Sequence, residues 1–130
     1  MNQMTNLEAT AQTSPFAARY NNFIGGEFRA PASGQYFEII SPITGGVIGE
    51  IARSNAADVD AALDAAHKAK DALGPSSVTN RANALKTIAQ KLEENLELLA
   101  ICETWDNGKA IRETRAADLP LAIDHFRYFA

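Results

Sequence analysis

The sequence predicts an α+β chain in which small β-hairpins are followed by three to four amphipathic helices. Two features lead to this fold class. Up to residue 52, glycine pairs separate short aromatic and aliphatic runs, as they do in tight hairpins. From residue 53 onward, apolar residues recur every three or four positions, which is the spacing of one helix face. The 130 residues are 46% hydrophobic and 22% charged, a composition typical of a globular domain.

The β segments are short and bounded by glycine. In NNFIGGEF the pair Gly25-Gly26 predicts a two-residue hairpin turn, because glycine adopts the positive φ of such turns without steric cost. QYFEII over 35–40 predicts the next strand, SPITGG over 41–46 a turn, and VIGEIA over 47–52 the returning strand. We therefore expect two hairpins in this part of the chain.

Asn55 and Asp58 predict the start of the first helix. Asn is a strong N-cap, and Asp58 stands three residues further on, at the position of a capping-box acid. Gly74-Pro75 predicts the end of this helix. The residues at helical spacing on its apolar stripe are Val59, Ala62, Leu63, Ala66 and Leu73. Such a stripe must pack on another element, and we expect much of that element to be missing from these 130 residues.

The later helices are also predicted from their capping residues. A second helix begins near Ser77, and Asn95 divides it into two pieces, because Asn caps a helix better than it propagates one. The Asn-Gly of DNGK predicts a stop at Gly108. In the last segment we expect Asp118 to act as an N-cap, which places Pro120 in a first turn, where proline is tolerated.

Charge and hydropathy exclude two classes of partner. A net charge of −4 argues against binding to nucleic acid or to an anionic membrane surface. No window approaches the ~18 apolar residues of a membrane span. Residues 1–18 lack the basic and apolar regions of a signal peptide, and we expect a mobile tail there and an ordered part over 19–130. A cytoplasmic protein is the resulting prediction.

Side-chain chemistry alone assigns no catalytic and no cofactor-binding residue. Cys102 lies in the apolar stretch ELLAICETW without a histidine at helical spacing, which predicts a small core residue and not a nucleophile. His67 is predicted to be solvated. His125 is predicted to be structural, because no carboxylate stands three or four residues from it. The glycine pairs do not match a phosphate-binding loop.

Five stretches of sequence follow one another without a large gap from about Tyr20 to Ala130. They are YNNFIGGEF, ISPITGGVIGEIARS, DVDAALDAAHKAKDAL, ETWDNGK and DHFRYFA. Together they resemble the N-terminal region of the NAD(P)-dependent aldehyde dehydrogenase superfamily. The residues around Trp105 and in LPLAIDHFRYFA are most similar to those of the bacterial acetaldehyde dehydrogenase subgroup.

This resemblance implies that residues 19–130 are the N-terminal piece of the family's α/β Rossmann-like NAD-binding domain, truncated in its last helix. The whole protein would be an oxidoreductase that converts a short aliphatic aldehyde to a carboxylate with NAD or NADP, as a homo-oligomer. The family's catalytic cysteine, general-base glutamate and dinucleotide loop lie beyond Ala130, so we expect the isolated chain to be inactive. In a second, open hypothesis the chain is a truncated, non-catalytic binding or assembly module that docks on an aldehyde dehydrogenase subunit.

The resemblance also implies two sites. Asp106 aligns with the carboxylate of a structural Na⁺ or K⁺ site that the backbone carbonyls of Ile39 and Ile40 complete, and oxygen ligands suit such a hard cation. The open alternative is that Asp106 only helps to close the helix at DNGK. Ala117 and Leu121 align with positions that line the aldehyde entry tunnel, and packing is the alternative for both.

Overall fold

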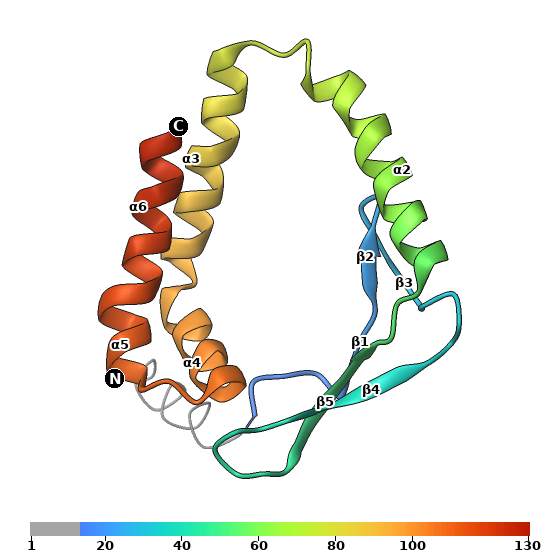
Figure 1. Cartoon of the computed structure of the whole chain (residues 1–130). Coiled ribbons are helices and arrows are strands. Elements are labelled where there is room, and N and C mark those ends of the chain that lie inside the picture. Colours follow the sequence, from blue (N-terminus) through green and yellow to red (C-terminus); the bar gives the residue numbers. More distant parts are fainter. Residues whose placement is uncertain (1–13) are drawn as a thin grey trace. The chain divides into compact units, whose positions relative to one another are not determined.

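The computed structural model describes residues 14–130, which divide into two compact units (Figure 1). The strand unit comprises Ala17–Ile40 and Val47–Ser76; the helical unit comprises, of the described residues, 14–16, Ser41–Gly46 and Ser77–Ala130. Most of the tail expected over 1–18 lies outside the described residues, and its last part, residues 14–18, forms no helix or strand. Among the described residues, no helix is long and apolar enough to cross a membrane.

A three-stranded sheet organises the strand unit, with strand order β1-β5-β4. Its strands are β1 (Arg19–Tyr20), β4 (Tyr36–Ile40) and β5 (Val47–Ala52). The antiparallel pairing of β4 with β5 confirms the second predicted hairpin. β1 pairs with β5 in parallel, and this pairing was not expected, because two residues that meet a distant partner carry no local signal.

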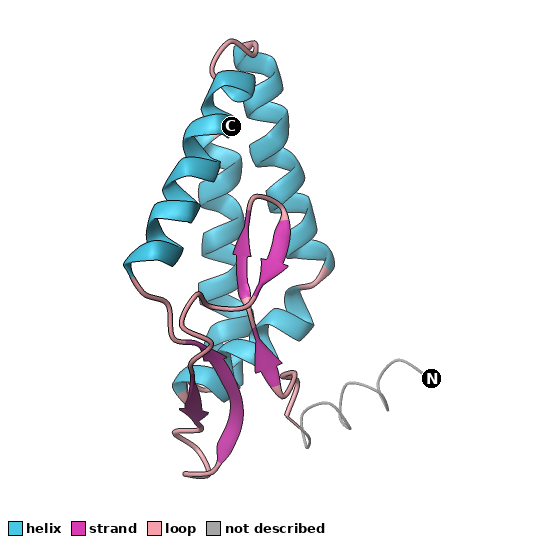
Figure 2. Ribbon diagram, turned by 90° about the vertical axis from the view of Figure 1, so that its right-hand side faces the viewer, coloured by secondary structure: helices cyan, strands magenta, loops and turns pink. Residues whose placement is uncertain are grey.

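The first predicted hairpin is also confirmed (Figure 2). Strands β2 (Asn22–Ile24) and β3 (Glu27–Arg29) pair antiparallel around Gly25 and Gly26, whose φ angles are 64° and 86°. Two consecutive positive φ values define the turn type that matches strand twist, and only glycine adopts them freely. Phe23 and Phe28 face each other across the hairpin with ring centroids 5.1 Å apart.

Helix α2 (Ala56–Leu73) begins and ends where the sequence predicts. The Asn55 side chain accepts hydrogen bonds from the backbone of Ala57 and Asp58, and the Asp58 carboxylate accepts one from the Asn55 N–H, at 2.9 Å. The predicted capping box is therefore confirmed. The second carboxylate oxygen of Asp58 accepts the N–H of Ala32 at 2.8 Å, so this buried side chain also ties the helix start to the segment after β3.

The apolar stripe of α2 is present but remains uncovered. Val59, Leu63 and Leu73 are each more than half exposed. Within the strand unit α2 contacts β2, but this contact leaves most of the stripe exposed.

Two helices of the helical unit begin and end as predicted. α3 (Val78–Glu94) starts at Ser77, whose hydroxyl accepts the N–H of Asn80 at 3.1 Å. Asn95 separates it from α4 (Leu96–Asn107). Gly108 then ends α4 in the left-handed region, with a φ of 78°.

The last segment differs from its prediction at Asp118. Here α5 (Ile111–Glu113), the π-helical turn η1 (Thr114–Asp118) and α6 (Leu119–Phe129) run on without a break. The predicted N-cap role of Asp118 is wrong, because its backbone is helical, at φ −65° and ψ −51°, and its side chain makes no capping hydrogen bond. Its carboxylate pairs with Lys109 instead.

The core of the helical unit lies where α6 runs beside α3 (Figure 1). Ala89 on α3, Ala100 and Ile101 on α4, and Ile123 on α6 are the buried apolar side chains of this unit among the described residues. The Arg127 guanidinium on α6 reaches the Glu93 carboxylate on α3 at 2.6 Å. By contrast, Tyr128 and Phe129 are 82% and 73% exposed.

The double role of Asp58 predicts the effect of Asp58→Asn. The substitution places an amide NH₂ against a backbone N–H donor, which we expect to lower the free energy of unfolding by about 1–3 kcal/mol. Asp60→Asn is the matched control, because Asp60 is an exposed carboxylate on the same helix. Urea unfolding of both variants measures the difference. Equal stability of the two variants would contradict the role given to Asp58.

Candidate functional site

The residues of the expected cation site lie on two elements. Asp106 stands in the last turn of α4 with an exposed side chain. Ile39 and Ile40 end β4, where the pairing with β5 shifts: Ile39 opposes Gly49, and Ile40 opposes Val47. Such a bulge interrupts the ladder and leaves backbone groups unpaired, as a carbonyl ligand requires. Because Asp106 belongs to the helical unit and the two isoleucines to the strand unit, the cation site stays a prediction.

The end of α4 shows which residues close this helix. The Gly108 N–H donates to the Thr104 carbonyl at 2.9 Å, and the Asn107 side chain accepts the Lys109 N–H at 2.8 Å. Within residues 14–130, Asp106 makes no side-chain hydrogen bond or ion pair. Its neighbours therefore close the helix, and its carboxylate is left available for another ligand. No three His, Cys, Asp or Glu side chains in the described part of the chain cluster as metal ligands, but a site of one carboxylate and backbone carbonyls needs no such cluster.

The two expected tunnel residues share one exposed face. Ala117 lies in η1 and Leu121 on α6, four residues apart, and side chains at this spacing are neighbours on a helix. Ala117 is exposed and Leu121 is 57% exposed. Neither is packed into the core of the helical unit, so both side chains are available to line a surface or channel.

The π-turn next to these residues was missed by the sequence analysis. Thr114, its first residue, is fully buried, and its hydroxyl lies 3.0 Å from the Ile111 carbonyl, 3.3 Å from the Ala100 carbonyl and 3.3 Å from the Thr104 hydroxyl. It can donate to one carbonyl and accept from Thr104. At the other end of the turn, Lys109 Nζ lies 2.7 Å from one Asp118 oxygen and 2.5 Å from the other. The hydrogen bond with Asp118 raises the pKa of the Lys109 ammonium.

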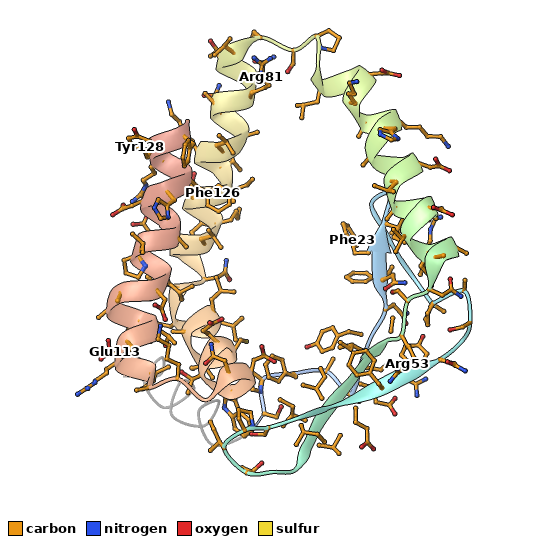
Figure 3. All side chains as sticks on the ribbon, viewed as in Figure 1. Phe23, Arg53, Arg81, Glu113, Phe126 and Tyr128 are labelled. Atoms are coloured by element: carbon orange, nitrogen blue, oxygen red, sulfur yellow. The ribbon has the colours of Figure 1, made fainter. Side chains whose placement is uncertain are left out.

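No described cysteine or histidine forms a nucleophilic centre. Cys102 on α4 is half-buried, less than the core position predicted for it, and this burial raises the pKa of its thiol. A raised pKa keeps the thiol protonated and unreactive. His67 and His125 are exposed. Figure 3 labels Phe126 and Tyr128, two aromatic side chains on α6.

Comparison with known proteins identifies the family. The family described as "Aldehyde dehydrogenase family" matches residues 28–130. The aldehyde dehydrogenase of Paracoccus denitrificans (strain Pd 1222) is 66% identical over 116 residues, which are 89% of this chain and 23% of that protein. The chain therefore belongs to the aldehyde dehydrogenase family.

Further relatives carry more specific names. An acetaldehyde dehydrogenase of Pseudomonas aeruginosa is 62% identical over 88% of this chain and 23% of its own length. A long-chain-aldehyde dehydrogenase of Acinetobacter sp is 59% identical over the same shares. The chain thus spans about a quarter of the length of the curated relatives it matches. Over this stretch, identity does not separate relatives named for short and for long aldehydes.

A solved structure confirms the fold class. An indole-3-acetaldehyde dehydrogenase in complex with NAD⁺ matches with a TM-score of 0.86 and 32% sequence identity, over 95% of this chain and 25% of that chain. The arrangement of strands followed by helices is therefore that of the N-terminal part of an NAD-binding domain in this family.

The raised pKa of Cys102 predicts slow alkylation. Near neutral pH we expect its reaction with iodoacetamide to be several-fold slower than that of glutathione, because each unit of pKa removes about nine-tenths of the thiolate. Mass spectrometry of the peptide that contains Cys102 measures the rate, and urea-unfolded protein is the control, in which the thiol is solvated. Alkylation as fast in the folded as in the unfolded protein would contradict the assignment.

Proposed function

We propose that the protein to which this chain belongs is an NAD(P)-dependent aldehyde dehydrogenase that oxidises a short aliphatic aldehyde to its carboxylate. The observation that carries the activity is the match to this family over residues 28–130. The small and aliphatic side chains of Ala117 and Leu121 support a short apolar substrate. The cofactor seen with the indole-3-acetaldehyde dehydrogenase favours NAD⁺ over NADP⁺.

The reaction class assigns a supporting role to this chain. A cysteine thiolate adds to the aldehyde, the nicotinamide accepts the hydride, and water then releases the carboxylate. Cys102 is poorly suited to the first step, because its thiol is half-buried, stays protonated and has no base beside it. In this proposal residues 19–130 form the N-terminal part of the NAD-binding domain and contribute the tunnel wall and a cation ligand, while the catalytic groups lie beyond Ala130. The whole protein works as a cytoplasmic homo-oligomer.

A second candidate is a non-catalytic module that docks on an aldehyde dehydrogenase subunit. It is favoured by the apolar side chains that the described residues leave uncovered on two helices: Val59, Leu63, Leu73, Tyr128 and Phe129. The intact mass of the protein in its own cell separates the two candidates. A mass several times 14.0 kDa supports the enzyme, whereas a mass of 14.0 kDa supports the module.

The proposed activity predicts a clear division between the chain and the whole protein. We expect the purified 130-residue chain to give no NADH above background with acetaldehyde and NAD⁺, because it lacks the reacting cysteine. The whole protein is expected to reduce NAD⁺ in the same assay. Absorbance of NADH measures both. NADH formation by the 130-residue chain would overturn this assignment of roles, and an inactive whole protein would overturn the proposed function.

The cation site predicts a cation-specific stabilisation of the whole protein. K⁺ or Na⁺ is expected to raise the free energy of unfolding by about 1 kcal/mol at about five times its Kd, because it binds the folded state alone. Bulky N-methylglucamine at equal ionic strength should not. Asp106→Asn is expected to abolish this difference, and Asp60→Asn, an exposed carboxylate on α2, is the matched control. A difference that survives in Asp106→Asn would exclude Asp106 as a ligand.

A further inference from the structure

Two buried residues of the last helical segment are out of phase for an α-helix. Thr114 is fully buried and Ile123 is 3% exposed. From Thr114 to Ile123 the chain advances nine residues, and an α-helix turns by about 100° at each residue. The two side chains would therefore lie on opposite sides of an uninterrupted α-helix. Both could then be buried only if α3 and α4 covered opposite sides of that helix.

The π-turn removes this mismatch. In η1 the N–H of Leu119 donates to the carbonyl of Thr114, five residues back, whereas an α-helix bonds four residues back. The turn thus holds one more residue than an α-helical turn. This extra residue reduces by about 100° the angle that separates the Thr114 and Ile123 side chains around the helix axis. Thr114 can then face α4, and Ile123 can lie on the buried side of α6.

The same turn decides where Leu121 points. Leu121 follows Thr114 by seven residues, which is close to two full α-helical turns. Without the extra residue, Leu121 would lie on the buried side with Thr114. In the structure it is 57% exposed, whereas Thr114 is not exposed at all. The π-turn therefore directs Leu121 out of the core, onto the face that it shares with Ala117.

Contacts at both ends hold the turn. At its first residue, the Thr114 hydroxyl lies 3.3 Å from both the Ala100 carbonyl and the Thr104 hydroxyl of α4, and 3.0 Å from the Ile111 carbonyl of α5. Its one proton goes to one of the two carbonyls, and it can accept the proton of Thr104. Lys109, which precedes α5, donates a hydrogen bond to one carboxylate oxygen of Asp118, the last residue of the turn, and forms an ion pair with this carboxylate. Between them, Arg115 forms an ion pair of 2.7 Å with Glu97, but both of these side chains are close to half exposed, and such pairs contribute little.

We propose that Thr114 and the Lys109–Asp118 pair are positioning residues that set the direction of Leu121 and thereby the aldehyde chain length that the enzyme accepts. This inference rests on the proposed function of Leu121 in the aldehyde tunnel. None of the three residues need touch the substrate. They act by keeping the extra residue within η1, so that Leu121 stays turned away from the core.

Kinetics of the whole enzyme test the proposal through the ratio of kcat/KM for acetaldehyde to kcat/KM for octanal. Leu121→Ala is expected to change this ratio by about tenfold, the scale of a few methylenes in an apolar pocket. Thr114→Val, which keeps the shape and removes the hydroxyl, should shift the ratio by a similar factor. Thr114→Ser, which restores the hydroxyl, should return it toward the original value. Asp118→Asn weakens the second contact and is expected to act in the same direction.

Hydrogen exchange provides a readout that does not depend on activity. In Thr114→Val and Asp118→Asn the Leu119 amide, which donates across the π-turn, should exchange faster than in the original protein. Lys109→Met removes the other partner of the Asp118 contact and is expected to speed exchange of the same amide. Its control is Lys86→Met on α3, because Lys86 is an exposed lysine of the same unit. Faster exchange together with a shifted ratio supports the proposal.

Two results would overturn it, and they are distinguishable. If Leu121→Ala shifts the ratio but neither Thr114→Val nor Asp118→Asn does, the tunnel assignment stands and the positioning role is wrong. If Leu121→Ala itself leaves the ratio unchanged, Leu121 does not line the tunnel, and the positioning role is wrong together with that part of the proposed function. Should Thr114→Val fail to fold, the half-exposed pair still decides the question through Asp118→Asn and Lys109→Met.

Discussion

The packing of α6 along α3 is the contact on which the helical unit depends. Burying one side chain of the size of Ile123 contributes about 1.5–3 kcal/mol, and small residues such as Ala89 let two helices approach closely. The backbone before α6 must therefore deliver Ile123 to α3 while Thr114 stays against α4. A regular helix cannot meet both conditions, which explains why the chain contains a π-turn at the point where both would otherwise conflict.

The strand unit is held together by different means. Many of its apolar side chains are exposed, as Phe23, Phe28 and Val59 show. Its order comes instead from two local features. The two positive-φ glycines form the hairpin turn, and the oxygens of the Asp58 carboxylate accept hydrogen bonds from two backbone N–H groups. Such contacts fix local geometry well, but they contribute less stability than a buried core.

Features with a local cause could be predicted from the sequence. Asn55, Ser77 and Gly108 end or start helices through contacts within a few residues, and Gly25-Gly26 forms its turn for the same kind of reason. Long-range features could not be predicted, because the strand β1 exists only through a distant β5. Asp118 is an example of such a feature. Its sequence context suits an N-cap, but its carboxylate pairs with Lys109, and the helix continues through it to the buried Ile123.

The residues of the candidate site could not be predicted from local sequence patterns. No spacing or charge pattern pointed to Asp106, Ala117 or Leu121, and only the resemblance to a family drew attention to them. The structure adds that the exposed Asp106 carboxylate makes no hydrogen bond or ion pair within residues 14–130, and that Leu121 is turned outward. Thr114 left no signal in the sequence, because its burial, which conflicts with that of Ile123 on a straight helix, is known only from the structure.

The closed end of α4 also bears on chemical ageing. Asn-Gly sequences deamidate readily when the glycine nitrogen is free to attack the carbonyl carbon of the preceding side-chain amide. Here that nitrogen donates to Thr104, and the Asn107 amide is held at both ends, by the Lys109 N–H and by the Glu103 carboxylate at 2.6 Å. Asn107 is thus protected from isoaspartate formation for as long as the last turn of α4 stays folded, and the lifetime of this asparagine becomes a measure of how often that turn opens.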